Sequence, residues 1–505
     1  MLRTGEQYVE ALRDGRQVHL GSEVVTDVTA HPAFRNAVRS VARLYDAARA
    51  DADRYGHRDE DDGAVHNAIW LRPRTQADLL ARRRAHDGWA DLTYGLIGRS
   101  PDHVAGYLTG MACHPAVADA HGQGFGAHIV DYWRFARDND LYVSYAVAPP
   151  GRARGPEVLR TPSGSAPASD PARTSALRVV AEDDAGITVW GTKILATAGA
   201  LADELLIGNL LPLSPGEESF AVTFATPVAA PGVKLISRKS FEHGAHPLDD
   251  PLAARFDESD VVVFCDNVFV PWERVFAHGH LDTALALFNH TPAHVLGNAQ
   301  AQSRLLAKMR LTLGVITRVS ELTGTARIPA VREMLATRAT EVAVVDGLIA
   351  ASDAHPDDWP EGHVSPNLQT LYATTAWSTE NVPVFMHGVR ELLGSQPFQV
   401  AADAGVFDDP ETAGVLVSAL GSESVAEAQD RYRLMKLAWD LVGSEFASRH
   451  LQYEMFYAGA KHVTRARVGH NFRWDVVAAA ADRCLSDLQG VAALDGVAAP
   501  ATARP

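Results

Sequence analysis

The stretch ALRVVAEDDAGITVWGTKIL, residues 176–195, consists of short runs of β-branched and apolar residues separated by Gly, Asp and Ala. Runs of the same kind are LYVSYAVAPP (141–150), ELLIGNLL (204–211), FAVTFATPV (220–228), GVKLISRKSF (232–241) and DVVVFCDNVFVP (260–271). Short strands at this spacing are typical of an antiparallel barrel or sandwich. The sequence therefore predicts a middle antiparallel β domain over residues 141–277.

Helical periodicity lies on both sides of this β region. The segment HPAFRNAVRSVARLYDAARADADRY (31–55) repeats apolar residues every three or four positions, and the same period returns after residue 277. Just before the first helical segment, RQVHLGSEVVTDV (16–28) alternates as a small hairpin does. We expect an α+β chain with an N-terminal mainly helical domain, 1–140, and a C-terminal helix bundle, 278–505.

Composition limits the kind of partner. The chain has 505 residues and a net charge of -16, from 46 basic and 62 acidic side chains. This balance disfavours binding to nucleic acid or to anionic membranes, because both require concentrated positive charge. Small molecules or proteins are the expected partners.

Cysteine usage and the N-terminus bear on the compartment. Cys113, Cys265 and Cys484 are far apart and form no CxxC pair, which supports neither a disulfide framework nor a thiolate metal site. The first residues, MLRTGEQYVEALRDGRQ, lack the apolar run of a signal peptide. The sequence predicts a cytoplasmic protein without a bound metal.

Common nucleotide and hydrolase signatures are absent from the sequence. The nearest approach to a dinucleotide fingerprint is GQGFGAH (122–128), which lies in a helical region with no strand before it. No P-loop, HExxH or GxSxG motif occurs. The chain is therefore not expected to bind NAD(P)H directly.

Five long segments fall in an order that resembles one known family. They are YGLIGRSPDH (94–103), LYVSYAVAPP (141–150), GTKILATAGALAD (191–203), RFDESDVVVFCDNVFVPWERV (255–275) and MKLAWDLVGSEFASRHLQYEMFY (435–457). Together they are similar to the 4-hydroxyphenylacetate 3-monooxygenase family, the oxygenase components of two-component aromatic hydroxylases. The similarity extends from TGEQYVEALRDGR (4–16) to AADRCLSDL (480–488).

This resemblance implies an acyl-CoA-dehydrogenase-like architecture and a homotetramer. It further implies a flavin-dependent aromatic monooxygenase that receives FAD as FADH2 from a separate NAD(P)H:flavin reductase. The family reacts FADH2 with O2 to form a flavin hydroperoxide, which hydroxylates a phenolic or related aromatic substrate. Such chemistry requires a dry pocket, a cation for the developing phenolate and a group that accepts the phenol proton.

The resemblance places the substrate and catalytic groups on two segments. Arg99 matches the family's arginine, and Ser100 follows it in the same motif. His103 stands where the family has tyrosine, and Tyr145 stands where it has histidine. If the two groups have exchanged roles, His103 is the proton acceptor and lies on the wall opposite Tyr145; otherwise both only line the pocket, or the substrate differs.

The resemblance also names flavin contacts. Thr197 matches a threonine beside the flavin ring, and Arg449 is assigned either to the pyrophosphate or to an ion pair with Glu445 one turn away. The stretch APPGRARG, with Arg152, replaces an NPxxDR-like family motif that helps to seat the dinucleotide. The remaining predicted contacts are Tyr145, Ala146, Val147, Gly443, Ser444, Glu445 and Phe446.

Other functions stay open at this point. An acyl-CoA-dehydrogenase-like flavoenzyme shares the expected layout but uses a carboxylate as its base. A related dehydratase needs an iron–sulfur cluster, for which the three cysteines are too few and wrongly spaced. N-hydroxylation, hydroxylation of a heteroaromatic ring and a binding protein without catalysis are the remaining alternatives.

Overall fold

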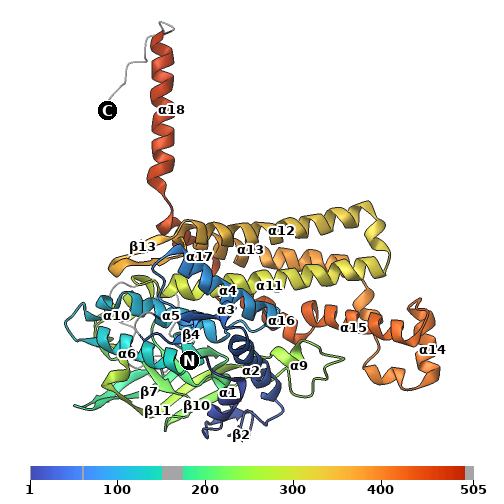
Figure 1. The fold of residues 1–505 in the computed structure, drawn as a ribbon, viewed down its shortest axis with the longest axis horizontal. Helices are drawn as coiled ribbons and strands as arrows, with labels where there is room; N and C mark the ends of the chain where they lie inside the picture. Colours follow the sequence, from blue (N-terminus) through green and yellow to red (C-terminus); the bar gives the residue numbers. More distant parts are fainter. Residues whose placement is uncertain (1, 60–61, 151–174, 495–505) are drawn as a thin grey trace.

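The computed structural model describes residues 2–59, 62–150 and 175–494. Helices come first, then two sheets, then a long helix bundle (Figure 1). The first helices are α1 (Gly5–Ala11), α2 (Arg35–Ala50), α3 (Ala52–Tyr55), α4 (Gln76–Thr93), α5 (Pro101–Cys113) and α6 (Phe125–Asp138). After the sheets come α10 (Thr283–Asn289), α11 (Ala293–Leu322), α12 (Pro329–Ala354), α13 (Leu368–Leu393), α14 (Pro410–Ala419), α15 (Val425–Val442), α16 (Glu445–Phe456), α17 (Lys461–Asn471) and α18 (Trp474–Leu494).

Two sheets lie against each other in the middle of the chain. The larger has the order β2-β1-β10-β11-β7-β6 and the smaller β12-β9-β8-β5. Their bounds are β1 (Val18–Leu20), β2 (Glu23–Val25), β5 (Val143–Ala146), β6 (Arg178–Glu182), β7 (Gly186–Thr197), β8 (Glu204–Ile207), β9 (Val222–Pro227), β10 (Val233–Ser237), β11 (Asp260–Pro271) and β12 (Val275–His278). Smaller hairpins are β3 (Gly56–Arg58) with β4 (Val65–Asn67) and β13 (Asp357–Trp359) with β14 (His363–Ser365), and a short helix α9 (Ala253–Phe256) precedes β11.

The sheets are mixed rather than purely antiparallel. The predicted N-terminal hairpin is present as β1 and β2, and β1 then pairs in parallel with β10. The pairing of β5 with β8 is also parallel. Two parallel strands need a long connection between them. Other elements separate β1 from β10 along the chain, and likewise β5 from β8. Local alternation predicts such strands but carries no information about their direction.

The two longest strands show why this segment forms a sheet. Along β7 the odd-numbered residues from Ile187 to Lys193 are buried while the even-numbered ones are half-buried, the period of a strand with one inward face. β11 follows the same rule until a bulge between Cys265 and Val268 shifts its register. The sandwich core therefore lies between the inward faces of the two sheets.

A close crossing of α5 and α11 fixes one side of the future site. All 13 residues of α5 are buried, and a Cβ on Gly110 would lie 2.2 Å from the backbone nitrogen of Ala293. A Cβ on Gly297 would meet the ring of Tyr107 at 2.2 Å. Only glycine allows this approach, which brings the second half of α5 against the first turns of α11.

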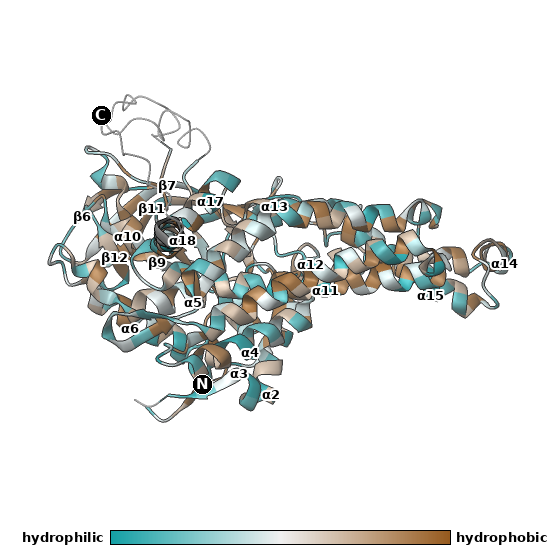
Figure 2. Cartoon of the chain, turned by 90° about the horizontal axis from the view of Figure 1, so that it is seen from above, coloured by the Kyte–Doolittle hydropathy of each residue, from teal (hydrophilic) through white to brown (hydrophobic). Residues whose placement is uncertain are grey.

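The final helix stands away from the rest of the molecule. Figure 1 shows α18 pointing out from the body, and Figure 2 shows it nearly end-on. Its apolar side chains are exposed, among them Trp474, Val476, Val477, Leu485 and Leu488. In the described ranges no helix combines the length and the apolar character that crossing a membrane requires.

Candidate active site

A cleft of about 410 Å³ opens between the sheets and α16. Its walls come from the segment just before α5, from β5 and the residues after it, from the end of β7, from the start of β11 and from α16. The lining residues are Arg99, Tyr145, Val147, Ala148, Ile194, Leu195, Thr197, Leu210, Asp260, Arg449, Gln452, Tyr453, Phe456 and Tyr457. Leu195 and Phe456 are about half exposed and mark the mouth.

Arg99 lies just before α5, which begins at Pro101, a residue suited to the first helical turn. Its backbone N–H donates to Glu258 Oε2 at 2.8 Å, and its guanidinium donates to the carbonyl oxygen of Tyr457 at 3.1 Å and to the imidazole of His103. Within the described residues, no carboxylate forms an ion pair with this guanidinium, although it is only 7% exposed. Among the described residues, the cleft therefore contains a buried cation with no carboxylate at ion-pair distance, although burial, which lowers its pKa, is outweighed by the neighbouring tyrosines and Glu258, which raise it.

His103 lies behind the cleft rather than in it. The residue is completely buried and is not part of the lining, whereas Tyr145 is. The two rings are neighbours with centroids 5.6 Å apart, and Tyr107 stacks on Tyr145 at 5.5 Å. Burial, and next the charge of Arg99, lower the pKa of His103 well below its usual value, so the ring is neutral. In this arrangement His103 and Tyr145 are adjacent and not on opposite walls.

A network of ion pairs forms the other charged part of the cleft. Arg449 on α16 donates to both oxygens of Asp260, at 2.6 and 2.9 Å, and to Glu258. Arg238 also donates to Asp260, to Oδ2 at 2.8 Å, which is the oxygen that accepts from Arg449 Nε. Burial alone would raise the pKa of Asp260, but the two arginines outweigh it and hold that pKa well below its usual range.

The predicted flavin contacts separate into two groups. Thr197 and Val147 line the cleft, and the Thr197 hydroxyl donates to Asp260 Oδ1 at 2.7 Å. Ala146 is buried in β5 and does not reach the lining. Arg152 lies outside the described residues.

The segment after α15 does not reach the cleft. Ser444 caps α16 by accepting from the Ala447 N–H at 3.1 Å, and Glu445 pairs with Lys239. The predicted alternative pair between Glu445 and Arg449 is therefore not formed, because each has another partner. Ser444, Glu445 and Phe446 line a neighbouring hollow, and Gly443 packs on Trp439.

Sequence reasoning missed several lining residues. Asp260 begins β11, and the sequence predicts it only as the first residue of a strand. Gln452, Tyr453 and Tyr457 follow Arg449 at helical spacing, so they share its face of α16 and its continuation. That spacing was a usable signal for the three, whereas the position of Asp260 depends on a contact 189 residues away in the chain.

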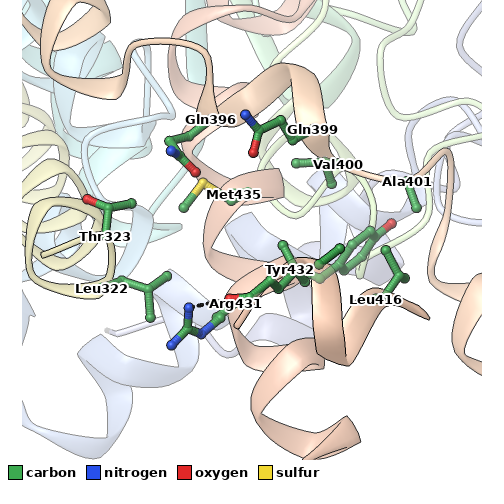
Figure 3. A pocket seen from close by; sticks show the side chains of 12 residues that line it. Leu322, Thr323, Gln396, Gln399, Val400, Ala401, Leu416, Arg431, Tyr432 and Met435 are labelled. Atoms are coloured by element: carbon green, nitrogen blue, oxygen red, sulfur yellow. Dashed lines mark hydrogen bonds between the residues drawn. The ribbon is translucent and has the colours of Figure 1, made fainter. Parts of the chain in front are cut away.

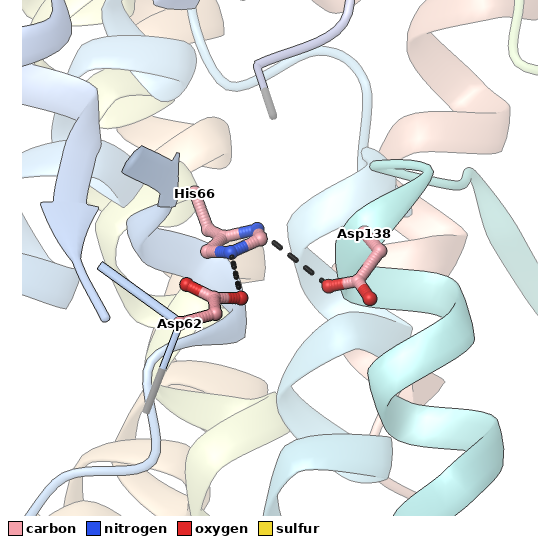
Figure 4. Close-up of side chains that lie close together, drawn as sticks. All are labelled: Asp62, His66 and Asp138. Carbon is pink, nitrogen blue, oxygen red and sulfur yellow. Dashed lines mark hydrogen bonds and ion pairs between the residues drawn. The ribbon is translucent and has the colours of Figure 1, made fainter. Parts of the chain in front are cut away.

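Figures 3 and 4 show two further features among the described residues. A hollow of about 310 Å³ lies at the far end of the bundle, where Arg431 donates to the carbonyl oxygen of Leu420 (Figure 3). In Figure 4, His66 lies between Asp62 and Asp138, a spacing that a metal ion could use. However, the Arg137 guanidinium already contacts both carboxylates, at 3.0 and 2.8 Å. The Arg137 guanidinium therefore already supplies the positive charge that a metal ion would bring to these two carboxylates.

The fold and the cleft define an α+β protein in which a β sandwich lies between two helical regions. Its cleft, between the sandwich and the helix bundle, is lined by aromatic rings and a buried cation. Family models described as the N-terminal and C-terminal parts of 4-hydroxyphenylacetate 3-hydroxylase match residues 4–277 and 284–486. The chain therefore belongs to the 4-hydroxyphenylacetate 3-hydroxylase family. The predicted family is confirmed, and so is the predicted order of N-terminal helices, β domain and C-terminal helix bundle, although the sheets are mixed rather than antiparallel.

Individual relatives agree with this assignment. The oxygenase component of 4-hydroxyphenylacetate 3-monooxygenase from Geobacillus sp. (strain PA-9) is 30% identical, over 90% of this chain and 91% of its own. The oxygenase component of 4-nitrophenol 2-monooxygenase from Rhodococcus sp. is 32% identical, over 92% and 87%. A crystal structure of the 4-hydroxyphenylacetate 3-monooxygenase oxygenase component, complexed with FAD and 4-hydroxyphenylacetate, superimposes with a TM-score of 0.86 at 28% identity, covering 97% of this chain and 99% of that one.

Proposed function

We propose that this chain is the oxygenase component of a two-component aromatic hydroxylase. It uses FADH2 from a separate NAD(P)H:flavin reductase, together with O2, to hydroxylate a phenolic substrate. The observation that carries the proposal is the Arg99 guanidinium, which lines the cleft and has no carboxylate partner within the described residues. A buried guanidinium without a carboxylate partner can stabilise a substrate oxygen that becomes negative during the reaction.

The residues present fit a flavin ring. The cleft has the size of a small-molecule site, and its walls combine apolar side chains with a few convergent polar groups. Because the Thr197 hydroxyl donates to Asp260, its lone pairs stay available to accept an N–H from the ring. When bound, reduced flavin supplies the electrons and the site of oxygen activation.

The substrate side of the reaction falls to Arg99 and Tyr145. Arg99 stabilises the phenolate oxygen, and the Tyr145 side chain holds the aromatic ring and its hydroxyl within the cleft. His103 and Ser100 act from behind this pair, since both are buried outside the lining. Leu195, Leu210 and Phe456 keep water away from the reacting atoms.

The dehydrogenase alternative is less well supported by the residues. That reaction needs a carboxylate base, and Asp260 is the one carboxylate among the described lining residues. Its ion pairs with Arg449 and Arg238 keep it as a weakly basic anion. N-hydroxylation or hydroxylation of a heteroaromatic ring would use the same cleft and is separated by the choice of substrate.

We further propose a homotetramer in the cytoplasm. The exposed apolar side chains of α18 support assembly, because a helix of 21 residues whose described apolar side chains face solvent is marginally stable alone. Analytical ultracentrifugation of the full chain and of a chain ending at residue 473 tests this: the full chain should sediment as a tetramer and the shortened chain as a smaller species.

The activity is tested by mixing the purified protein with anaerobically reduced FAD, adding oxygen and a panel of phenols, and measuring hydroxylated product and hydrogen peroxide. We expect product with at least one phenol and little peroxide. An Arg99→Met variant should release mainly peroxide, while Arg310→Met, an exposed control, should behave as the parent. Quantitative conversion of oxygen to peroxide with every aromatic compound would overturn the proposal.

A further inference from the structure

A continuous line of buried hydrogen bonds extends from the cleft into the helical core. Arg99 Nη1 lies closest to Nε2 of His103 and 3.2 Å from its Nδ1, and Nδ1 lies 3.2 Å from Gln300 Oε1. The line continues from Gln300 Nε2 to Ser100 Oγ at 2.9 Å and from Ser100 Oγ to Asp102 Oδ1 at 2.5 Å. His86 Nδ1 closes it, 2.8 Å from the other oxygen of Asp102.

The two charged members decide the direction of every bond between them. A guanidinium can only donate, and an ionised carboxylate can only accept. Ser100 must therefore give its proton to Asp102 and accept from the Gln300 amide nitrogen. The amide oxygen of Gln300 then faces His103 and must accept, so the proton of the imidazole sits on Nδ1.

We infer that Gln300 is a positioning residue that fixes His103 as the neutral Nδ1–H tautomer and turns its Nε2 lone pair toward Arg99. A neutral acceptor can hold the guanidinium in place without cancelling its charge. A carboxylate in place of the His103 imidazole would neutralise the Arg99 guanidinium, whose charge the substrate oxygen needs. The catalytic consequence rests on the proposed function, whereas the tautomer itself does not.

The surroundings of His103 support a neutral ring. The charged groups that act on it are Arg99 and, more weakly, Arg304, both of which oppose a second proton. The aromatic neighbours are Tyr107 and Tyr145, with centroids 5.2 and 5.6 Å away. His103 is completely buried, and its ring also bonds to the backbone of Gly297, so Gln300 Oε1 is the side-chain acceptor beside Nδ1 among the described residues.

The test is nitrogen NMR of the flavin-free protein with ¹⁵N-labelled histidine, in which the His103 signals are assigned by their loss in His103→Asn. We expect one protonated nitrogen, Nδ1, in the parent near neutral pH. Gln300→Met removes the acceptor and should give mixed tautomers. Gln300→Glu keeps an acceptor and should restore Nδ1–H while raising the pH at which the ring protonates.

Gln302→Met is the matched control. Gln302 lies on the same helix, is equally buried, and donates to the carbonyl oxygen of Leu371 at 2.9 Å, outside the line. Product formed per FADH2 should fall between about tenfold and a hundredfold in Gln300→Met but not in this control. A proton on Nε2 in the parent, or an unchanged His103 spectrum in Gln300→Met, would overturn the inference. An expected spectrum with no hydroxylation of any aromatic compound would instead remove the proposed function and leave the role of Gln300 intact.

Discussion

Arg99 and Arg449 face the same cleft, and their surroundings differ in one respect. Arg449 is held by two carboxylates, those of Asp260 and Glu258, whereas the guanidinium of Arg99 meets a carbonyl oxygen and a neutral imidazole. A buried charge that is paired with a counter-ion of the same chain has a structural role. A buried charge without one is stable in the fold only at a cost, and that cost is useful where a ligand brings the missing negative charge.

The largest effect is expected from Arg449→Met. Removing this guanidinium leaves Glu258 and part of Asp260 as buried carboxylates without compensation, so the free energy of unfolding should fall by about 3 kcal/mol. Differential scanning calorimetry measures the change as a lower Tm. An unchanged Tm would show that the ion pairs add nothing to stability and would remove the distinction between the two arginines.

Arg99→Met should give the opposite pattern. Product formation should fall by about a hundredfold, because a single donor to a developing oxyanion has this magnitude. The Tm should stay the same or rise, since methionine has no charge to bury. Measuring product yield and Tm on the same preparation checks both halves, and a large loss of stability would place Arg99 with the framework residues.

A smaller change is expected from Tyr145→Phe. The aromatic ring, which lies 5.2 Å from the Arg99 guanidinium carbon, is kept while its hydroxyl is lost. We expect product formation to fall about tenfold, equivalent to one hydrogen bond to the reacting oxygen. Tyr453→Phe is the control, because that hydroxyl donates to the carbonyl oxygen of Gly98 at 3.2 Å. Equal losses in the two variants would contradict a specific role for Tyr145.

Lys193 extends the comparison to a third buried cation. Its ammonium donates to the Gly208 carbonyl and to Asn209 Oδ1, at 2.8 and 2.5 Å, and burial lowers its pKa to about 7. The unfolded chain binds this proton up to about pH 10.5 while the folded chain has released it, so stability should rise between about pH 7 and 9.

The expected contribution of Lys193 is about 1 kcal/mol for each pH unit in that range. Lys193→Met should lose this part of the slope in urea unfolding followed from about pH 7 to 9. Parallel curves for the parent and the variant would mean that Lys193 keeps its usual pKa in the folded protein.

Local sequence patterns predicted the helices and strands better than they predicted which segments contact one another. The alternation of β7 and the helical period of α11 follow from the sequence alone, and the family resemblance placed Arg99 and His103 in one motif. Asp260 joins Arg449 across 189 residues, and β1 joins β10 in parallel, so neither contact has a local signal. Gly443 and Ser444 were assigned to the flavin by resemblance, and the packing of Gly443 on Trp439 and the capping role of Ser444 give them other contacts.

The glycine-mediated crossing of α5 and α11 has a consequence for how this enzyme can change over generations. Gly110 packs directly on the backbone of Ala293, so there is no room for a side chain between the two helices. Even one added methyl group would displace the segment that carries Arg99. The opposite rim, with the half-exposed Leu195 and Phe456, can accept new side chains at little cost. We expect altered substrate ranges in this lineage to arise by substitutions at the rim, while the charged end of the cleft is inherited unchanged.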